Sequence, residues 1–544
     1  MLSSGPNRIP VIDLFAGPGG LGEGFSAFSS DAGYHPFDVV LSIEKDPDAH
    51  RTLFLRSFFR QFGKNGKKIP DDYYSFLRGE IDLNDLFSRH AIESGAAKNE
   101  AILAELGSDS FSEEKLDELV ENALGDNDSW VLIGGPPCQA FSCVGRSRNR
   151  GIIGYVPEND PRHFLYREYL GIIARHWPPI FLMENVKGIL SAKINGARIF
   201  DHIISDLRDP AKATTQHRPK SGECFSYSLF SLVTGKDASG KGHDNPKDFV
   251  IHSEDFGIPQ TRHRVLILGI RNDLVVKGIE PPRLTKGINH VPVLTAISNL
   301  PFLRSGLSKN DSRNSWANSL ACSLEADWYK EIPDKEVRDC IESTVFEIKK
   351  GTAGIGYTYE KGKPFIPTKS ENIEQKGTAL MEWLQDERIG GVCNHEAKSH
   401  REDDLHRYLF VACFTKVKRK PPRLGDFPIS LLPKHNNVEL AVKGNSYFSD
   451  RFRAQIEDAP SKTITCHIAK DGHYYIHYDP KQCRSLTVRE CARLQTFPDN
   501  YFFCGSRTAQ YTQVGNAVPP LLACQIAQEI YLYYKKSIIA DTNH

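Results

Sequence analysis

Residues 9–24 read Ile-Pro-Val-Ile-Asp-Leu-Phe-Ala-Gly-Pro-Gly-Gly-Leu-Gly-Glu-Gly, an apolar run that leads directly into a glycine-rich loop. Gly17, Gly19 and Gly22 satisfy the spacing G-x-G-x-x-G, and the segment after them is apolar and helix-like. Glycines at such positions let backbone N–H groups and a helix N-terminus approach a ligand closely. Glu44 follows at the end of the next apolar run, where a carboxylate can bind ribose hydroxyls. This pattern alone fits a nicotinamide or flavin nucleotide as well as S-adenosylmethionine.

The first half of the chain alternates apolar runs of strand length with segments of helical periodicity. The helical segments include Glu114–Leu124 and Phe164–Ala174. The strand-length runs are Ile9–Phe15, Val39–Ile43, Trp130–Ile133, Ile180–Met183 and Val265–Ile270. This alternation predicts an α/β fold of the Rossmann-like kind, with a mostly parallel sheet covered by helices on both faces.

The chain changes character after the last of these strands. Residues 272–460 are rich in proline and glycine and show only short strands, which predicts a second, smaller and irregular domain inserted between residues 1–271 and 461–544. The C-terminal piece is expected to complete the first domain, with a hairpin around Asp471-Gly472 followed by two helices. The acidic, largely helical stretch Arg51–Ser129 is interpreted as an elaborated crossover between strands.

Composition excludes several classes of protein. The 544 residues are 40% hydrophobic and 25% charged with a formal net charge of zero, so any DNA-binding surface must gather its basic residues on one face. No apolar run is long enough to span a bilayer, and no secretory signal is visible, which favours the cytoplasm. The twelve cysteines form no C-x-x-C pair, which indicates reduced thiols and no metal site.

The segment Trp130-Val-Leu-Ile-Gly-Gly-Pro-Pro-Cys-Gln-Ala-Phe-Ser142 carries the strongest chemical signal. It is a strand that ends in a rigid Pro-Pro step and delivers Cys138 at the carboxyl edge of the sheet, where open α/β folds bind ligands. A single cysteine is usually a small buried hydrophobe, and this interpretation is preferred for most of the other eleven. The rigid polar setting of Cys138 instead favours a nucleophile.

Two further pieces lie next to strands. Phe181-Leu-Met-Glu-Asn-Val186 would bring Glu184 and Asn185 to the same edge as Cys138, although a lone glutamate is usually solvated or paired. Ile258-Pro-Gln-Thr-Arg-His-Arg-Val265 leads Arg262 and Arg264 into a strand. Arginine there supplies fixed charge and forked donors, or serves only as a salt-bridge partner.

Taken together, these blocks resemble the cytosine-C5 DNA methyltransferase family. The blocks of the family occur in family order: Phe-Ala-Gly-x-Gly-Gly, Pro-Pro-Cys-Gln, Glu-Asn-Val, Gln-x-Arg-x-Arg, then Arg484–Asp499 and Gln513–Pro520. The resemblance covers both ends of the chain and leaves out mainly the stretch after Glu44 and the region before Pro460.

The resemblance implies a mechanism. Cys138 would add to C6 of cytosine, Glu184 would hydrogen-bond or protonate N3, and Arg264 would orient the base carbonyl and the carboxylate. The methyl donor would be S-adenosylmethionine. None of these groups can reach cytosine inside stacked duplex DNA, so the base must be flipped out.

The resemblance also implies the binding residues. Cofactor contacts fall on Phe15, Gly17, Gly19, Gly20, Glu44, Asn516 and Val518, with Glu80 and Asp82 as candidates near the adenine amine. DNA contacts fall on Gln139, Ser142, Arg146, Arg148 and Arg262, in part through a loop at 142–160 that also holds Arg150. The inserted region, 272–460, corresponds to the target-recognition domain of the family, and its basic run Lys416–Arg423 is a candidate phosphate contact or an exposed loop.

Three alternatives stay open. A transfer-RNA methyltransferase shares these catalytic blocks, and Cys413-Phe-Thr415 is similar to a tripeptide of that branch. A binding-only protein with a degenerate site has no support, because Cys138, Glu184 and Arg264 are all present. A nucleotide-dependent oxidoreductase rests on the glycine loop alone. The expected partners are double-stranded DNA and a restriction or defence-system subunit, with no membrane, and the expected role is protection of host DNA in restriction-modification or anti-phage defence.

Overall fold

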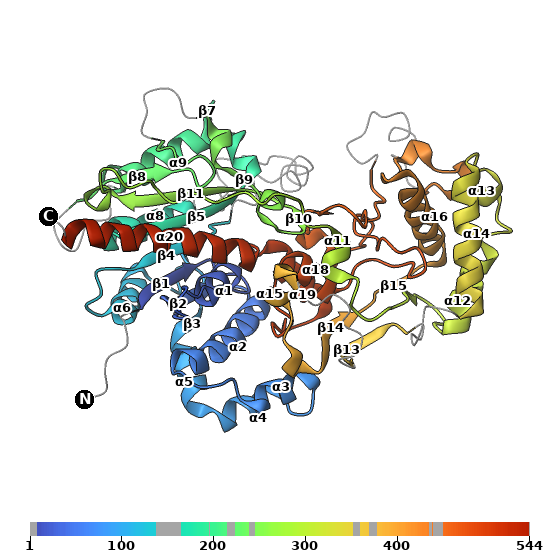
Figure 1. The fold of residues 1–544 in the computed structure, drawn as a ribbon, viewed down its shortest axis with the longest axis horizontal. Coiled ribbons are helices and arrows are strands. Elements are labelled where there is room, and N and C mark those ends of the chain that lie inside the picture. Colours follow the sequence, from blue (N-terminus) through green and yellow to red (C-terminus); the bar gives the residue numbers. More distant parts are fainter. Residues whose placement is uncertain are drawn as a thin grey trace.

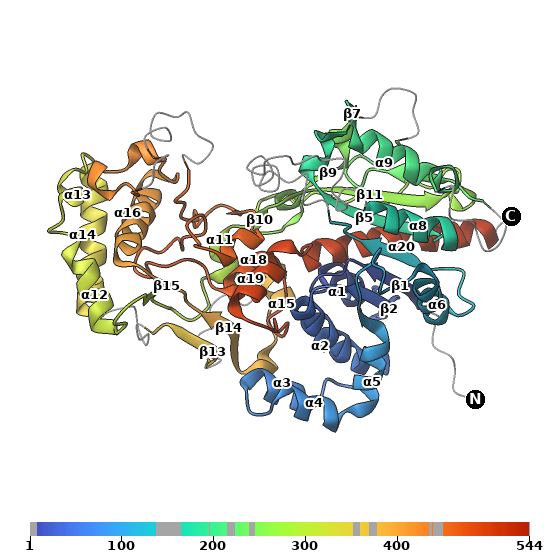
Figure 2. The ribbon, with the colours of Figure 1, turned by 180° about the vertical axis from the view of Figure 1, so that it is seen from behind.

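The computed structural model describes residues 8–137, 165–194, 196–214, 224–238, 245–351, 360–368, 378–434, 438 and 450–542. A large lobe is built around one twisted sheet, and a smaller lobe is built from a group of helices (Figure 1). The view from behind shows the same two lobes joined by a layer of short helices and strands (Figure 2). Within the described residues, no helix combines the length and apolar character needed to cross a membrane.

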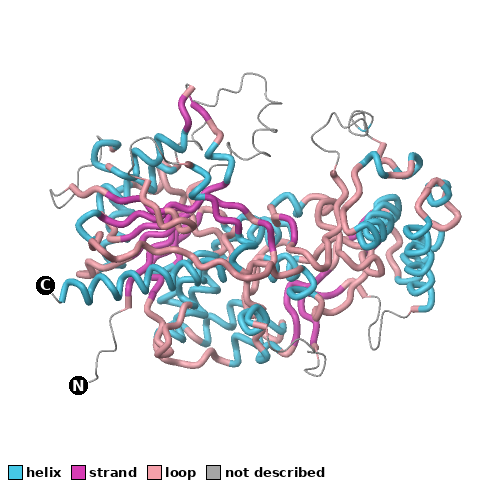
Figure 3. The backbone as a smooth tube through the Cα atoms, turned by 45° about the horizontal axis from the view of Figure 1, so that its top comes forward, coloured by secondary structure: helices cyan, strands magenta, loops and turns pink. Residues whose placement is uncertain are grey.

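The central sheet has eight strands, and seven of them follow the order β3-β2-β1-β4-β5-β11-β8, with β9 also paired to β11. The first five are mutually parallel, whereas β11 runs antiparallel to β5, β8 and β9. The bounds are β1 Ile9–Leu14, β2 Phe37–Glu44, β3 Ala101–Leu103, β4 Val131–Gly134, β5 Ile180–Val186, β8 Tyr227–Phe230, β9 Val250–His252 and β11 His263–Arg271. The mostly parallel sheet predicted from the sequence is confirmed, and the strands stand at the centre of the large lobe (Figure 3).

Helices cover both faces of this sheet, and alternate residues of β1 show why. Ile9 and Val11 pack with helix α1 (Gly20–Ala27) and the long helix α20 (Pro520–Thr542). Ile12 and Leu14 pack on the other face with α6 (Glu113–Leu124), α8 (Tyr166–His176) and α9 (Ile199–Arg208). A strand buried on both faces must be apolar throughout, as β1 is apart from Asp13.

The stretch between β2 and β4 is a crossover elaborated by helices, as expected. It contains α2 (Pro47–Lys64), α3 (Asp71–Arg78), α4 (Leu83–Arg89) and α5 (Ala91–Glu100), and then the three-residue edge strand β3 and α6. Asp46 caps α2 by accepting hydrogen bonds from the backbone N–H groups of Asp48 and Ala49.

The inserted region is more regular than its proline and glycine content predicted. Its main core packs α12 (Arg313–Cys322), α13 (Asp327–Lys330), α14 (Lys335–Lys350) and α16 (Glu402–Lys418) together. In α14 the buried residues Val337, Ile341, Val345 and Ile348 recur every three or four positions. Only short strand pairs, β12 (Gly306–Leu307) with β15 (Ser399–His400) and β13 (Gly362–Pro367) with β14 (Gly391–Glu396), accompany these helices.

The C-terminal return differs from the expectation in two respects. It contains three helices rather than two: α18 (Val488–Leu494), α19 (Arg507–Asn516) and α20. The predicted hairpin at Asp471-Gly472 is wrong, because Gly472, at φ 79°, begins a turn with no strand on either side. The strand pairing of the C-terminal return is instead formed by β16 (Ser461–Lys462), which pairs in parallel with β10 (Gln260–Thr261). The return therefore joins the large lobe directly.

The middle layer draws on both the insert and the return. Helices α11 (Val293–Ile297) and α15 (Ala379–Leu384) share one apolar core with α18 and α19. The boundary predicted at residue 271 coincides with the end of β11. The insert is not fully separate, however, because its helices α11 and α15 belong to the same core as α18 and α19 of the return.

Candidate active site

The residues singled out from the sequence gather at one edge of the sheet. Because β1, β2, β4 and β5 are parallel neighbours, their carboxyl ends meet there. Strand β11 begins at the same edge, since it runs antiparallel to β5. This topology brings together the loop after Phe15, Glu44, Gly135, Glu184 and Arg264.

An ion pair joins two of the three predicted catalytic residues. Arg264 Nε lies 2.9 Å from Glu184 Oε1, and the two side chains retain only 15% and 13% of their exposure. A second nitrogen of Arg264, Nη1, donates to the carbonyl oxygen of His263 at 2.9 Å, which fixes the direction of the guanidinium. Burial lowers the pKa of Arg264, and the neighbouring Glu184 carboxylate opposes this shift. A charged pair is thus held in a partly closed site, where electrostatic interactions are strong.

The end of β4 lies against this pair. A Cβ atom placed on Gly135 would stand 3.0 Å from Glu184 Oε2, so the absence of a side chain leaves room for the carboxylate. Asn185, buried in β5, points its Nδ2 toward the carbonyl oxygen of Pro136 at 3.4 Å. The segment that leads to Cys138 is therefore held beside Glu184.

Several predicted residues lie outside the described part of the chain. They are the nucleophile Cys138, the DNA-contact candidates Gln139, Ser142, Arg146 and Arg148, and the rest of the loop at 142–160. Their assignments stay predictions.

The Gln-x-Arg-x-Arg block divides into structural and site residues. Arg262 is fully buried, and its Nη1 and Nη2 donate to the carbonyl oxygens of Ile464 at 2.9 Å and Gly515 at 3.2 Å. Gln260 is also buried and bonds Gln495 and the backbone of Ile464. A guanidinium with no exposed surface cannot reach a DNA strand, so the DNA contact predicted for Arg262 does not fit this structure. The hydrogen bonds of Arg262 instead connect the first part of the large lobe to the C-terminal return.

The glycine loop adopts an unusual backbone. Phe15, Gly17 and Gly19 have φ values of 56°, 59° and 97°, a region that favours glycine and is rare for phenylalanine. Glu44 Oε2 accepts a hydrogen bond from the N–H of Gly17 at 2.7 Å, and its Oε1 accepts one from Asp46 at 2.7 Å. Burial raises the pKa of Glu44. Nothing lies within 4 Å of a Cβ placed on Gly17, so open space faces the loop there.

The last sequence block packs against this loop, as expected. A Cβ on Gly20 would overlap the carbonyl oxygen of Val518, so Gly20 permits contact between α1 and the segment just before α20. Val518 is buried, whereas Asn516 at the end of α19 is exposed. Sequence reasoning missed Tyr501, whose hydroxyl donates to the carbonyl oxygen of Pro18 across 483 positions. No local pattern signals such a distant contact.

The acidic candidates Glu80 and Asp82 do not follow the third strand. Glu80 pairs with Arg78, and Asp82 caps α4, both within the helical crossover. Strand β3 lies later, beside β2, and the acidic residue just after its end is Glu105, which forms an exposed ion pair with Lys45 at 2.9 Å. Sequence analysis missed Glu105 because a three-residue strand carries almost no periodic signal.

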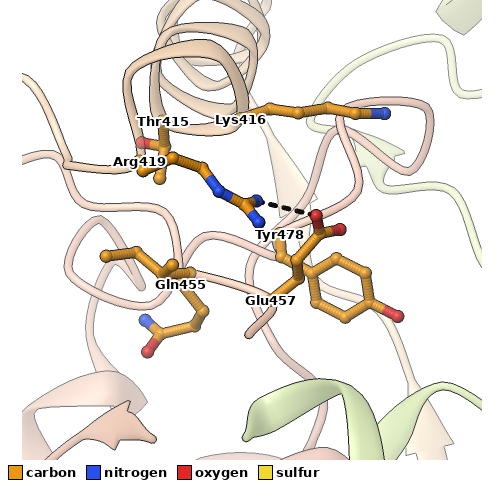
Figure 4. Close-up of a pocket in the computed structure, with 7 residues that line it drawn as sticks. Thr415, Lys416, Arg419, Gln455, Glu457 and Tyr478 are labelled. Carbon is orange, nitrogen blue, oxygen red and sulfur yellow. Dashed lines mark hydrogen bonds and ion pairs between the residues drawn. The ribbon is translucent and has the colours of Figure 1, made fainter. Parts of the chain in front are cut away.

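The basic run at the end of α16 is partly neutralised. Arg419 pairs with Glu457 at 2.8 Å and with Asp458 at 2.6 Å, beside a small pocket that Lys416 also lines (Figure 4). Lys418 pairs with Asp334. Lys416, Lys420 and Arg423 are the members of the run for which the described residues show no side-chain ion pair.

The tripeptide Cys413-Phe-Thr415 belongs to a helix core. Cys413 is fully buried on α16, and its Sγ lies 3.8 Å from Thr344 Oγ1. Burial raises the pKa of Cys413 well above its usual value, which suppresses the reactive thiolate. Of the ten cysteines in the described residues, Cys393, Cys413, Cys483, Cys491 and Cys504 are buried. The interpretation of cysteine as a small hydrophobe holds for these five, whereas Cys224, Cys322 and Cys466 are exposed.

Comparison with known proteins identifies the family. The family model for C-5 cytosine-specific DNA methylase matches residues 105–210 and 247–532. The type II methyltransferase M.Bpa9945I of Bacillus paralicheniformis is 30% identical, over 96% of this chain and 98% of its own length. The DNA (cytosine-5-)-methyltransferase M.ApeKI of Aeropyrum pernix is 26% identical, over 75% of this chain and 82% of its own. A solved putative DNA modification methyltransferase from an E. coli prophage covers 97% of this chain and 100% of its own, with 18% identity and a TM-score of 0.45.

The extent of the family match and the 30% identity over nearly the whole chain show that this protein belongs to the C-5 cytosine-specific DNA methylases, enzymes that transfer a methyl group from S-adenosylmethionine to C5 of cytosine.

Proposed function

We propose that this enzyme methylates cytosine through a covalent bond between Cys138 and C6, with Glu184 and Arg264 as the groups that stabilise the attacked base. The observation that carries the proposal is the Glu184–Arg264 ion pair, held against Gly135 three residues before Cys138. Cytosine C5 is a poor nucleophile. Addition of a thiolate to C6 places electron density on C5 and N3, and the site must accommodate that charge.

Glu184 and Arg264 have complementary tasks in this reaction. N3 of cytosine is a hydrogen-bond acceptor, so the Glu184 carboxylate must take up a proton before it can donate to N3. Arg264 holds the carboxyl group in place through Nε, and its remaining N–H groups can reach the carbonyl oxygen at C2. The positive charge of Arg264 would also favour the thiolate form of the cysteine that attacks the base, the role proposed for Cys138.

The loop after β1 fits an adenosine-containing methyl donor. S-adenosylmethionine, when bound, supplies the methyl group that C5 accepts. The open space at Gly17 and the free acceptor capacity of Glu44 fit the backbone and ribose contacts predicted for them. Phe15 and Gly19 belong to the same loop, and Val518 packs on it at Gly20. Asn516, two residues before Val518, is proposed as a further contact. Glu105 replaces Glu80 and Asp82 as the residue proposed near the adenine amine, because it follows β3 at the site edge.

The inserted region is proposed as the target-recognition domain, with 1–271 and 461–544 forming the catalytic domain. Lys416, Lys420 and Arg423 at the end of α16 are its candidate phosphate contacts, since Lys418 and Arg419 are engaged by acidic partners. Gln139, Ser142, Arg146 and Arg148 are proposed to contact DNA through the segment after Cys138. Phosphate contacts position a protein on DNA and do not themselves read sequence.

The proposed biological role is protection of host DNA in a restriction-modification or anti-phage system. Its support is the family and the relative named a type II methyltransferase. Such a role implies a cytoplasmic enzyme whose partner is a nuclease or a defence subunit acting on the same sequence.

The test compares Cys138→Ala with the wild-type chain and with Cys224→Ala, an exposed thiol outside every motif. The substrate, supplied together with S-adenosylmethionine, is a long duplex whose cytosines all carry fluorine at C5. Because fluorine cannot leave as a proton does, the final elimination is blocked and the Cys138–C6 bond persists. We expect a complex that survives denaturing electrophoresis for wild type and Cys224→Ala, and none for Cys138→Ala, with equal binding of S-adenosylmethionine by calorimetry. A stable complex with Cys138→Ala would refute the assignment.

A further inference from the structure

We propose that His252, Glu254 and His263 form a binding site for a divalent transition-metal ion, with zinc as the best match to the ligand set. The site stands on β9 and the start of β11, whose positions are labelled in Figure 1. Among the described residues, these three form the one group of histidine, cysteine and carboxylate side chains whose ligand atoms all lie within 4.8 Å of one another. The inference is independent of the proposed catalytic roles. It departs from the sequence-based expectation of no metal site, which rested on the spacing of the cysteines and did not consider this set of histidines and glutamate.

Strand pairing explains why the two histidines meet. His263 lies directly opposite His252 in the antiparallel pair of β11 and β9, so both side chains leave the same face. Their rings stack with centroids 3.9 Å apart and planes at 10°. His252 is exposed and His263 retains 32% of its side-chain exposure, so an ion can enter from solvent.

Glu254 completes the ligand set. Its Oε1 lies 2.8 Å from His263 Nε2, and its Oε2 is buried without a hydrogen-bond partner in the described structure. A buried carboxylate oxygen without a partner is costly, and a bound cation would satisfy it. The neighbouring Asp255 is already engaged by Lys286 at 2.7 Å and His290 at 3.3 Å, which leaves Glu254 as the available carboxylate.

The backbone between the ligands is fixed. The N–H and hydroxyl of Ser253 both donate to the carbonyl oxygen of Arg262, at 3.1 and 2.8 Å. These two hydrogen bonds to the residue before His263 lock the three ligands relative to one another. The ligand atoms lie within 4.8 Å of one another, whereas the donor atoms of a tetrahedral zinc site are ~3.3 Å apart. Small rotations of the three side chains would close this difference without a change of the backbone.

The ligand types point to zinc rather than to calcium or magnesium. Calcium and magnesium prefer sets of oxygen ligands, whereas two imidazoles and one carboxylate suit zinc and leave a fourth position for water. An imidazole ligand must be neutral. The other charged groups that face the cluster are Asp255, Lys187 and Lys462.

Occupancy would tie β9 to the start of β11, next to Arg264. The experiment titrates the metal-free full chain with zinc chloride and measures stoichiometry and affinity by calorimetry. We expect one zinc ion per chain. In metal sites, removing a residue that only hydrogen-bonds to a ligand already lowers the affinity for the metal about 10–100-fold. Changing a ligand itself, as in His252→Ala or Glu254→Gln, should therefore lower the affinity for zinc at least ~10-fold.

The matched control is His202→Ala, which removes an exposed histidine from α9 outside the cluster. It should bind zinc as wild type does. Melting temperatures without zinc show whether each variant is folded, and added zinc should raise the melting temperature of wild type and His202→Ala only. Absence of stoichiometric binding to wild type, or wild-type affinity in both ligand variants, would overturn the proposal.

Discussion

Arg262 and Arg264 are separated by one residue and have opposite surroundings. Arg262 is fully buried and donates to backbone carbonyls of the C-terminal return, whereas Arg264 faces Glu184 at the site edge. The sequence predicted both as functional, because the spacing of a motif does not reveal which side chains are buried. The pairing of Glu184 with Arg264 could be expected from the strand order, since antiparallel β11 starts where β5 ends.

This contrast predicts separate effects for two substitutions. Arg264→Ala removes the partner of Glu184 and one source of positive charge, so we expect methylation to fall by about 10²–10³-fold, with a smaller loss of stability than Arg262→Ala causes. Arg262→Ala leaves two buried carbonyl oxygens unpaired and a cavity, so we expect a loss of about 2–4 kcal/mol in the free energy of unfolding. Urea denaturation and initial methylation rates measure the two effects. The reverse assignment of effects would contradict the division of the motif.

Asp13 gives a prediction about pH. Burial raises the pKa of Asp13 to about 7, with the N–H of Gly22 and nearby Arg60 opposing the shift. The folded chain thus keeps this proton between about pH 4 and 7, where the unfolded chain loses it, so the contribution of Asp13 to stability falls as pH rises through that window. The full penalty above pH 7 is on the order of 4 kcal/mol.

Asp13→Asn should remove this penalty while keeping the acceptor for Gly22. We therefore expect the variant to gain stability relative to wild type as pH increases from 4 to 8, measured by urea denaturation at each pH. A difference between the two proteins that stays constant across this range would contradict the ionisation of a buried Asp13.

At the scale of elements, apolar periodicity predicted helices α6 and α8 and the central strands within three residues. It failed for β3, which is too short to show a period, and for the turn at Gly472, where a pair typical of hairpins has no strands beside it. The helical core of the insert was also missed, although Asp334 and Gly351 cap α14 and its apolar residues are regularly spaced. Because the connecting loops are rich in proline and glycine, the composition of the whole region did not reveal this helical pattern.

The contact between α1 and α20 predicts how two glycine substitutions differ. A Cβ on Gly24 would overlap Ala523 Cβ and the carbonyl oxygen of Pro520, so Gly24→Ala should cost about 1–3 kcal/mol through overpacking. A Cβ on Gly63, in α2, would have nothing within 4 Å, so Gly63→Ala should gain about 0.4–1 kcal/mol. Thermal unfolding of both variants measures the difference, and equal effects would show that α1 and α20 can separate freely.

At the scale of the whole molecule, two segments far apart in sequence build one catalytic lobe. Helix α20 covers the sheet face that α1 covers, β10 pairs with β16, and Tyr501 holds the glycine loop at Pro18. The order of sequence blocks predicted this return but not its contacts, because residues separated by hundreds of positions leave no local pattern. The Cys138 segment and its DNA-contact candidates remain predictions from sequence.

The most direct test of the central claim is bisulfite sequencing of plasmid DNA from cells that express this chain alone, beside the Cys138→Ala variant. The account predicts protected cytosines within one short sequence motif for the wild-type chain and none for the variant. Protection that persists in the Cys138→Ala variant would contradict the proposed nucleophile. Absence of protection in both would contradict DNA methylation by this chain acting on its own.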